Sequence, residues 1–153
     1  MADLDYEAFE KQVEEIKEEN EKLLATFENW LAEKGLSEKT INKHLNNVDF
    51  FLNFYLVYYD PPTEAKDGWN SIGSFLGDFF IRKAMWSSPA QVRSGATSLK
   101  KFYACMLEEY DILDESEYKE LTEEIKDELP EWMETSRRYD DESYSYEEVW
   151  GWG

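Results

Sequence analysis

The segment from Phe27 to Phe54 contains a helix stop followed at once by a helix start, and this pair of signals constrains the fold more than any other part of the chain. Gly35 can adopt the left-handed conformation that closes a helix, and Leu36 can fold back on the last turn. Ser37 is then a good N-cap for a second helix, because its hydroxyl can accept a hydrogen bond from the first turn. The segment therefore predicts two amphipathic helices joined by a tight turn.

The spacing of apolar residues predicts helices along the rest of the chain as well. We expect them over residues 4–34, 38–59 and 70–85, from Ser87 or Ser88 to Tyr110, over 114–128, and from Pro130 to about Arg138. No alternation typical of a strand runs for more than four residues. We therefore predict an all-α fold: a bundle of four core helices, a long N-terminal helix and additional C-terminal helices. Gly73 and Gly77 each destabilise a helix interior by about 1 kcal/mol relative to alanine, so we expect another backbone to approach them closely.

The first long helix carries an apolar stripe whose members recur at spacings of three and four residues. Its candidates for self-association are Phe9, Val13, Ile16, Asn20 and Leu23. An asparagine within such a stripe sets the register and oligomeric state of coiled coils, so the stripe is compatible with a homodimer. We favour the alternative, in which the stripe packs against the chain's own core and Asn20 lies where the helix leaves it.

The negative charge of the chain is unevenly distributed. Its formal net charge is −19. Residues 1–24 hold nine acids and three bases (−6), residues 25–110 ten acids and nine bases (−1), and residues 111–153 sixteen acids and four bases (−12). We therefore divide the chain into an acidic helical start at 1–24, a nearly neutral helical domain at 25–110 and an acidic helical extension at 111–153.

The residues that usually carry catalysis or bind metals are scarce. A single histidine, His44, on a face that we expect to be exposed, predicts neither a zinc site nor a catalytic triad. Cys105 alone cannot form an internal disulfide, which favours the cytoplasm, and we expect it to be a buried hydrophobe. We expect the carboxylates Glu120, Glu123, Glu124 and Asp127 to form a solvated helix face. No apolar run is long enough for a membrane span. We predict no enzyme, no cofactor and no membrane association.

The last residues differ in composition from the rest. Tyr144 and Tyr146 alternate as in an extended segment, and Trp150 and Trp152 follow. Four large aromatic side chains can bury considerable area in a groove. We expect the tail to dock on this chain or on a neighbouring copy, or else to serve as a peptide motif for another partner.

Basic and polar residues of the neutral middle are the candidates for DNA contacts, because lysine and arginine contact phosphates while threonine and asparagine bind backbone or base edges. They are Lys39, Thr40, Lys43, Asn47, Arg82, Lys83, Arg93, Lys100 and Lys101. The same residues could instead be ordinary solubilising groups.

Two segments resemble the core-binding domain of the tyrosine recombinase/phage integrase family. They are GLSEKTI at Gly35–Ile41 and SLKKFY at Ser98–Tyr103, and the resemblance covers roughly residues 22–110. It implies a SAM-like bundle of four helices that clamps double-stranded DNA and contacts other protomers. It also implies that Lys39, Thr40, Lys43, Arg93, Lys100 and Lys101 face the DNA. The catalytic arginine–histidine–arginine–tyrosine set of the family is absent.

Two hypotheses of different classes follow. In the first, the chain is a non-catalytic core-binding module that binds DNA, alone or as an accessory to a full-length recombinase. In the second, it is an acidic protein-interaction module that dimerises or imitates DNA, and whose residues 111–153 lie across the basic side between Lys39 and Lys101.

Overall fold

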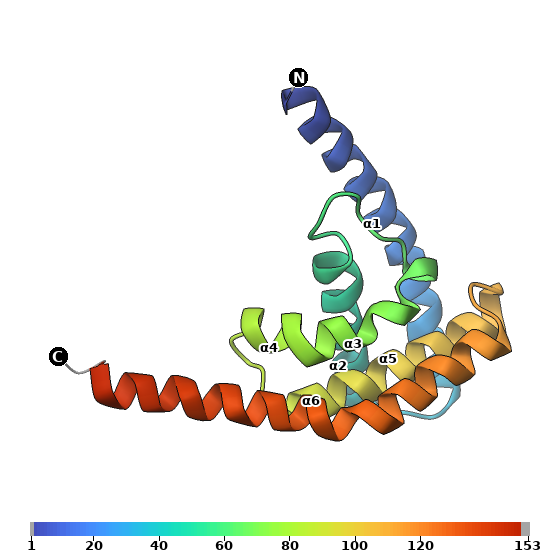
Figure 1. The fold of residues 1–153 in the computed structure, drawn as a ribbon. Coiled ribbons are helices and arrows are strands. Elements are labelled where there is room, and N and C mark those ends of the chain that lie inside the picture. The colour runs from blue at the N-terminus through green and yellow to red at the C-terminus, as the bar shows by residue number, and fades with distance from the viewer. Residues whose placement is uncertain (1, 151–153) are drawn as a thin grey trace.

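The chain folds into a set of helices, and in the residues that the computed structural model describes there is no strand (Figure 1). The structure describes the backbone of residues 2–150 and the side chains of residues 5–141. The long helices are α1 (Ala2–Glu33), α2 (Glu38–Phe50), α5 (Pro89–Tyr110) and α6 (Glu115–Trp150). Short segments lie between α2 and α5: η1 (Phe51–Tyr55), η2 (Ala65–Asp67), η3 (Trp69–Ser71), α3 (Ile72–Ser74), η4 (Phe75–Phe79) and α4 (Phe80–Lys83). The predicted all-α class is confirmed.

The turn between α1 and α2 forms as the local sequence predicts. Gly35 has a φ of 83°, and its N–H donates to the Ala32 carbonyl over 3.0 Å. The N–H of Leu36 reaches back to the Leu31 carbonyl. The Ser37 hydroxyl accepts from the N–H of Thr40 at the start of α2. These local hydrogen bonds set the direction in which α2 leaves α1.

The starts of α5 and α6 are also capped by their own residues. Ser88 caps α5 by accepting from the Gln91 N–H, and Pro89 occupies the first turn. At the start of α6, the Asp114 carboxylate accepts from the Glu117 N–H while the Glu117 carboxylate accepts from the Asp114 N–H. This reciprocal pair is a capping box, which satisfies two otherwise unpaired N–H groups.

Three predicted helix boundaries are wrong. The second helix becomes π-helical after Phe50 and ends at Tyr55 instead of 59. The predicted helix over 70–85 is a succession of 3₁₀, α and π turns between Trp69 and Lys83. The two predicted C-terminal helices are one helix, α6, with Pro130 inside it. Ile125 and Trp132 are buried on either side of this proline, and their packing outweighs the roughly 3 kcal/mol that an interior proline costs.

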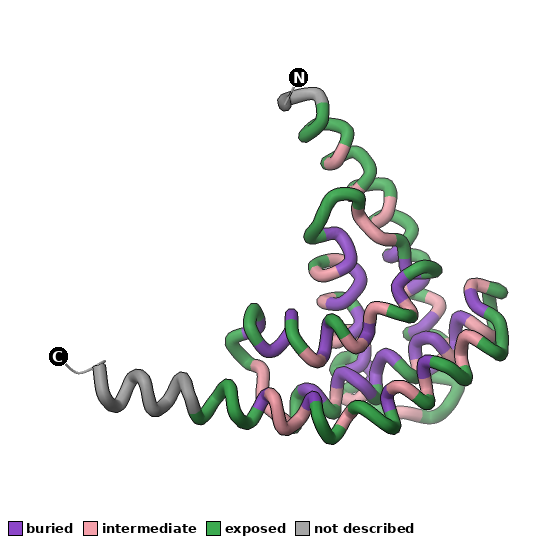
Figure 2. The backbone as a smooth tube through the Cα atoms, in the orientation of Figure 1, coloured by how far each residue is buried: buried purple, intermediate pink, exposed green. Residues whose placement is uncertain are grey.

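All the long helices contribute to one apolar core (Figure 2). Its largest fully buried side chains are Phe27 and Leu31 of α1, Phe51 and Leu52 of η1, Ile72 of α3, Leu76 and Phe79 of η4, Leu99, Phe102, Tyr103 and Met106 of α5, and Leu121 of α6. Cys105 is fully buried, as predicted. The acidic extension therefore shares its core with the preceding domain and is part of the same folded unit.

Among the side chains of α1 that the structure describes, those in the core lie in the second half of the helix. Leu23 is 2% exposed, and Asn20 is 1% exposed with its Nδ2 atom 2.8 Å from Asn53 Oδ1. Asn20 and Leu23 therefore pack against the chain's own core. The remaining members, Phe9, Val13 and Ile16, are half-buried. Their part in a homodimer stays a prediction.

Side chains of α6, and not the expected backbone, cover Gly73 and Gly77. A Cβ atom on Gly77 would lie 2.7 Å from Cδ1 of Trp132, and one on Gly73 would lie 2.5 Å from Oε1 of Glu124. Trp132 of α6 is 7% exposed and belongs to the core. The two glycines therefore make room for α6 to dock.

The tail was predicted to be extended at Tyr144 and Tyr146, and this is wrong because the α6 backbone continues to Trp150. The docking predicted for its four aromatic side chains falls on residues whose side chains lie outside those that the structure describes.

Candidate nucleic-acid interface

A groove of about 250 Å³ lies between α2 and α5 and is lined by residues of both helices. Lys43 and His44 come from α2, and Ala90, Arg93, Ser94 and Thr97 come from α5. We refer to these six residues as the α2–α5 groove. Lys43 and Arg93 are exposed. Two cations that are 50 residues apart in the sequence thus face one depression.

Three more cations extend this positive surface along the same helices. Lys39 precedes Lys43 by one turn of α2, and Lys100 follows Arg93 by two turns of α5. Lys101 lies near enough to His44 to lower its pKa. Five of the nine predicted DNA-binding residues are therefore cations on or beside the groove.

A buried polar network holds the two helices together beneath these cations. His44 Nδ1 lies 2.7 Å from the Ser98 hydroxyl. The Asn47 side-chain amide donates to Ser94 Oγ at 3.0 Å and to Ser98 Oγ at 2.9 Å. Asn47, a predicted DNA contact, therefore uses its side-chain N–H groups in hydrogen bonds within the chain. Because Ser98 is fully buried, the network sets the spacing of α2 and α5 where the groove lies.

His44 is buried, so the prediction of an exposed histidine is wrong. It is 5% exposed. Burial lowers its pKa, and the positive charges of Lys101 and Lys43 lower it further. The imidazole is therefore neutral at pH 7 and fits its hydrogen bond to Ser98. The helical period places His44 on the buried face, three residues after Ile41 and four before Val48; the prediction of exposure followed the polarity of histidine instead.

The remaining candidates lie outside the groove or are already bonded. Thr40 accepts a hydrogen bond from the Ser37 hydroxyl at 3.0 Å. Arg82, at the end of α4, makes a two-point ion pair with Asp78 at 2.8 and 3.0 Å. Lys83 lies over the ring of Tyr58, 5.6 Å from its centroid. The structure does not bring Arg82 and Lys83 together with the cations of α2 and α5.

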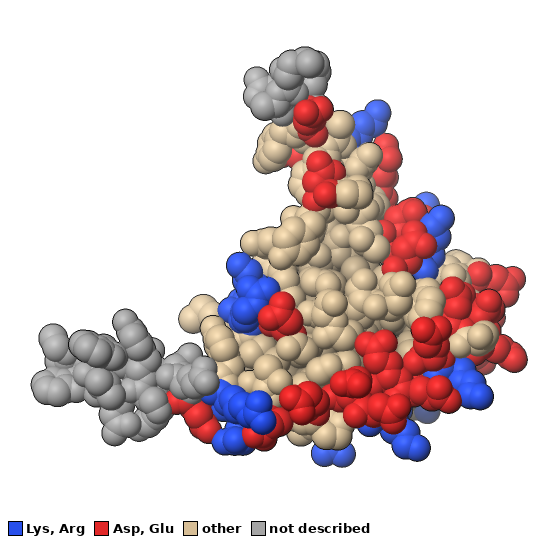
Figure 3. Space-filling view, in the orientation of Figure 1, with Lys and Arg blue, Asp and Glu red and all other residues tan. Residues whose placement is uncertain are grey.

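The acidic residues gather on other surfaces. In Figure 3, carboxylates form a band over α6 along the lower edge of the molecule. Glu120, Glu123 and Asp127 are exposed, as predicted, whereas Glu124 is half-buried against Gly73, and this burial raises its pKa. The predicted solvated face therefore holds for three of the four carboxylates.

The part of α6 that the structure describes does not cover the groove. All six lining residues of the groove belong to α2 and α5. In α6, up to Asp141, the ion pairs join residues of that helix to each other: Arg137 to Glu134 and Asp141, and Arg138 to Glu134. The predicted masking of the basic side by residues 111–153 is thus wrong for the described residues.

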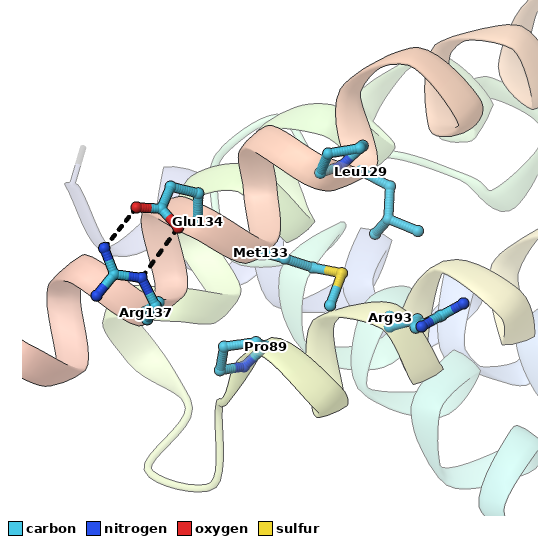
Figure 4. Close-up of a pocket in the computed structure, with 7 residues that line it drawn as sticks. Pro89, Arg93, Leu129, Met133, Glu134 and Arg137 are labelled. Atoms are coloured by element: carbon cyan, nitrogen blue, oxygen red, sulfur yellow. Dashed lines mark hydrogen bonds and ion pairs between the residues drawn. The ribbon is translucent and has the colours of Figure 1, made fainter.

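A second depression, of about 490 Å³, lies between the start of α5 and α6 (Figure 4). Met133 projects from α6 towards α5, between Pro89 and Arg93. Arg137 at its edge is held by Glu134 through two hydrogen bonds of 3.0 and 2.6 Å. Its floor is apolar, and Arg93 connects it to the α2–α5 groove.

A third, smaller depression opens beyond Asn47. It measures about 140 Å³, and its walls carry Phe50, Phe80 and Trp86 together with Asn46, Asn47 and Gln91. The sequence analysis did not single out Trp86, Asn46 or Gln91. The only sequence signal nearby is the run of aromatic residues at spacings of four, Phe50, Phe54 and Tyr58.

Two kinds of feature are absent from the described residues: a cluster of metal ligands and a membrane-spanning helix. Across residues 5–141, no three or more histidine, cysteine, aspartate or glutamate side chains are arranged to hold a metal ion. Among the helices that the structure describes, none is long and apolar enough to cross a membrane.

The chain matches no protein-family model, no curated protein and no solved structure in the comparisons. The resemblance to recombinase core-binding domains therefore rests on the two sequence segments alone.

Proposed function

We propose that the chain is a non-catalytic module, similar to a recombinase core-binding domain, that binds double-stranded DNA through the α2–α5 groove. The observation that carries this proposal is the convergence of Lys43 and Arg93 on one groove, with Lys39, Lys100 and Lys101 beside it. In the described part of the chain, no carboxylate forms an ion pair with any of these five cations. Unpaired cations on a rigid pair of helices suit a row of phosphates.

The buried polar network beneath the cations keeps α2 and α5 rigid relative to each other. The hydrogen bonds that Asn47 donates to Ser94 and Ser98, together with the one between His44 and Ser98, fix the distance between α2 and α5. The cations therefore need little ordering when DNA binds, which lowers the entropic cost of association.

The net charge of −19 opposes this binding only at long range. At about 0.15 M salt the Debye length is about 8 Å, so carboxylates farther away than this are largely screened from a phosphate in the groove. On α2 and α5 the acids lie at the ends: Glu38 and Asp49 on α2, Glu108 and Glu109 on α5. Glu134 of α6, which lines a depression together with Arg93, is paired with Arg137 and Arg138, and these two arginines balance its charge.

A salt titration of binding to duplex DNA tests the proposal. If all five cations contact phosphates, the logarithm of the association constant should fall against log[salt] with a slope of about −4.5, at roughly 0.9 per contact. Lys43→Glu and Arg93→Glu should each weaken binding and make the slope shallower. Lys66→Glu is the matched control, because it changes the net charge equally at an exposed lysine outside the groove.

Two results would overturn the proposal. One is the absence of binding to any duplex at about 50 mM salt, where five phosphate contacts should be strong. The other is an equal loss of affinity in the Lys43→Glu and Lys66→Glu proteins, which would mean that total charge and not the groove governs binding.

A second candidate function rests on the carboxylates of α6. The band of acidic side chains in Figure 3 suits a basic protein partner, either as a docking surface or as an imitation of DNA. Such a partner should be released by salt, and its binding should be weakened by charge reversal of Glu123 and Asp127 while Lys43→Glu leaves it unchanged. Removal of α6 is not a suitable test, since Leu121, Ile125 and Trp132 belong to the core.

A further inference from the structure

We propose that the small depression beside the groove is a pocket for an unpaired nucleobase, so that the chain prefers DNA with an unpaired segment to a fully paired duplex. The pocket is the one of about 140 Å³ whose lining includes the amide side chains of Asn46, Asn47 and Gln91 and the aromatic rings of Phe50, Phe80 and Trp86. We call it the Trp86 pocket. This inference rests on the proposed function, because it adds a second contact, between the pocket and one base, to DNA that is bound at the α2–α5 groove.

Among the aromatic residues of the pocket, Trp86 is held by edge-to-face packing against Phe50 and Phe80. The rings of Phe50 and Trp86 lie 5.2 Å apart at 74°, and those of Phe80 and Trp86 lie 6.2 Å apart at 75°. Trp86 is 55% exposed, so much of its indole surface is available to a ligand. A planar base that stacked on this indole would cover apolar surface that is now in contact with water.

The amide side chains of the pocket supply hydrogen-bonding groups of the kind that read base edges. The side-chain amides of Asn46, Asn47 and Gln91 each offer an acceptor oxygen, and those of Asn46 and Gln91 also offer donors. Asparagine and glutamine pair with base edges in many protein–DNA complexes. A lining that combines aromatic rings with side-chain amides favours a heteroaromatic ring with polar edges over a purely apolar ligand.

The Trp86 pocket and the α2–α5 groove are adjacent. Asn47 lines the pocket, and its amide donates over 3.0 Å to Ser94, which lines the groove. On α5, Gln91 of the pocket follows Ala90 of the groove directly. A strand whose phosphates contact Lys43 and Arg93 can therefore place a neighbouring base in the pocket.

Aromatic residues continue beyond the pocket and extend the surface for an unpaired strand. Phe54 stacks on Phe50 with centroids 4.8 Å apart, Tyr58 lies 5.7 Å from Phe54, and Tyr59 lies 4.9 Å from Tyr58. Phe54, Tyr58 and Tyr59 are all exposed, between 43% and 59%. The cation of Lys83 lies over Tyr58. Exposed aromatic rings with a cation nearby are typical of sites that bind single strands without sequence preference.

A fluorescence experiment on the full-length chain tests the pocket. The probes are one duplex and the same duplex with a gap of a few nucleotides opposite 2-aminopurine, whose emission changes when its stacking changes. We expect tighter binding to the gapped probe and a change in its emission on binding. Trp86→Ala should abolish the emission change and reduce the preference for the gapped probe by roughly tenfold, as for the loss of one stacked base.

Three variants distinguish the pocket from the groove. Met85→Ala is the matched control for Trp86→Ala, because Met85 is the adjacent residue and is 100% exposed. It should leave both binding and emission unchanged, and Trp86→Phe should retain part of the preference. Lys43→Glu should weaken binding to both probes by a similar factor and leave their ratio unchanged.

The outcomes separate failure of the pocket from failure of the groove. Equal affinities for the two probes, or a preference that survives Trp86→Ala, would overturn the pocket and leave the proposed duplex binding intact. Binding of a single-stranded 2-aminopurine probe that depends on Trp86, without any duplex binding, would support the pocket and overturn the groove. Absence of binding to every nucleic acid probe would overturn both and leave an aromatic side chain of a protein partner as the occupant.

Discussion

Replacement of Gly77 by alanine should reveal how α6 is anchored to the rest of the chain. The new Cβ atom would lie 2.7 Å from Cδ1 and 3.0 Å from Nε1 of Trp132, well inside the roughly 3.5–4.0 Å of an optimal carbon contact. Since Trp132 is 7% exposed and packed in the core, its ring cannot move aside without disturbing its neighbours. Such overpacking costs about 1–3 kcal/mol. Alanine recovers about 1 kcal/mol relative to glycine in a helix. The expected net loss is about 0–2 kcal/mol.

The sign of this effect should reverse when the indole is removed. Trp132→Ala alone should cost about 3–5 kcal/mol, which is a large part of the 5–15 kcal/mol that stabilises a typical domain. In that background Gly77→Ala meets no ring, so it should stabilise the protein by about 1 kcal/mol. The coupling free energy between the two substitutions should therefore be about 1–3 kcal/mol.

The assay is equilibrium unfolding in urea, followed by far-UV circular dichroism. Urea is preferable to guanidinium chloride because it leaves the repulsion among the charges of this −19 chain unscreened. Gly73→Ala is the matched control: its Cβ would first meet Oε1 of Glu124, the end of a flexible side chain that can rotate away. It should cost less than Gly77→Ala. A coupling below about 0.5 kcal/mol would refute the contact between Gly77 and Trp132.

Further predictions concern burial and charge. Because burial lowers the pKa of His44, the unfolded chain binds more protons than the folded chain below about pH 6.5. The wild-type protein should therefore lose stability relative to His44→Gln as the pH falls from about 7.5 to about 5. Parallel profiles of urea stability against pH for the two proteins would contradict this. Burial also raises the pKa of Cys105 to about 12, so the native thiol should resist a disulfide reagent that labels the urea-unfolded chain at once. Asn20→Ala should cost about 1–3 kcal/mol through the lost contact with Asn53 and leave the light-scattering mass unchanged; a lower mass would place Asn20 in a dimer seam instead. Added NaCl should raise the melting temperature, because it screens the repulsion within the acidic flanks.

The candidate interface could be predicted in part from the sequence. The near-neutral charge of residues 25–110 and the exposed lysines of α2 and α5 indicated where phosphate contacts could lie. The sequence did not indicate that Lys43 and Arg93 line one groove, because their meeting depends on how α2 packs against α5. It also did not distinguish Arg82, which is paired with Asp78, from cations without such a partner.

The sequence by itself determined those features that depend on neighbours within a few residues. Gly35 closes α1, Ser37 caps α2 and Ser88 caps α5, because each of these hydrogen bonds joins residues at most three positions apart. The all-α class follows from the same local signals together with the helical spacing of apolar residues.

The tertiary structure alone decided features that depend on contacts between distant residues. The hydrogen-bond partner of the buried His44 is Ser98, 54 residues away, and Gly77 is needed because Trp132 packs on it from α6. Pro130 stays within α6 because core packing on both sides outweighs its local cost. Helix periodicity shows which residues share a face, but it does not show which other helix covers that face. The groove and the Trp86 pocket both form where two such faces meet, so they become visible only in the folded chain.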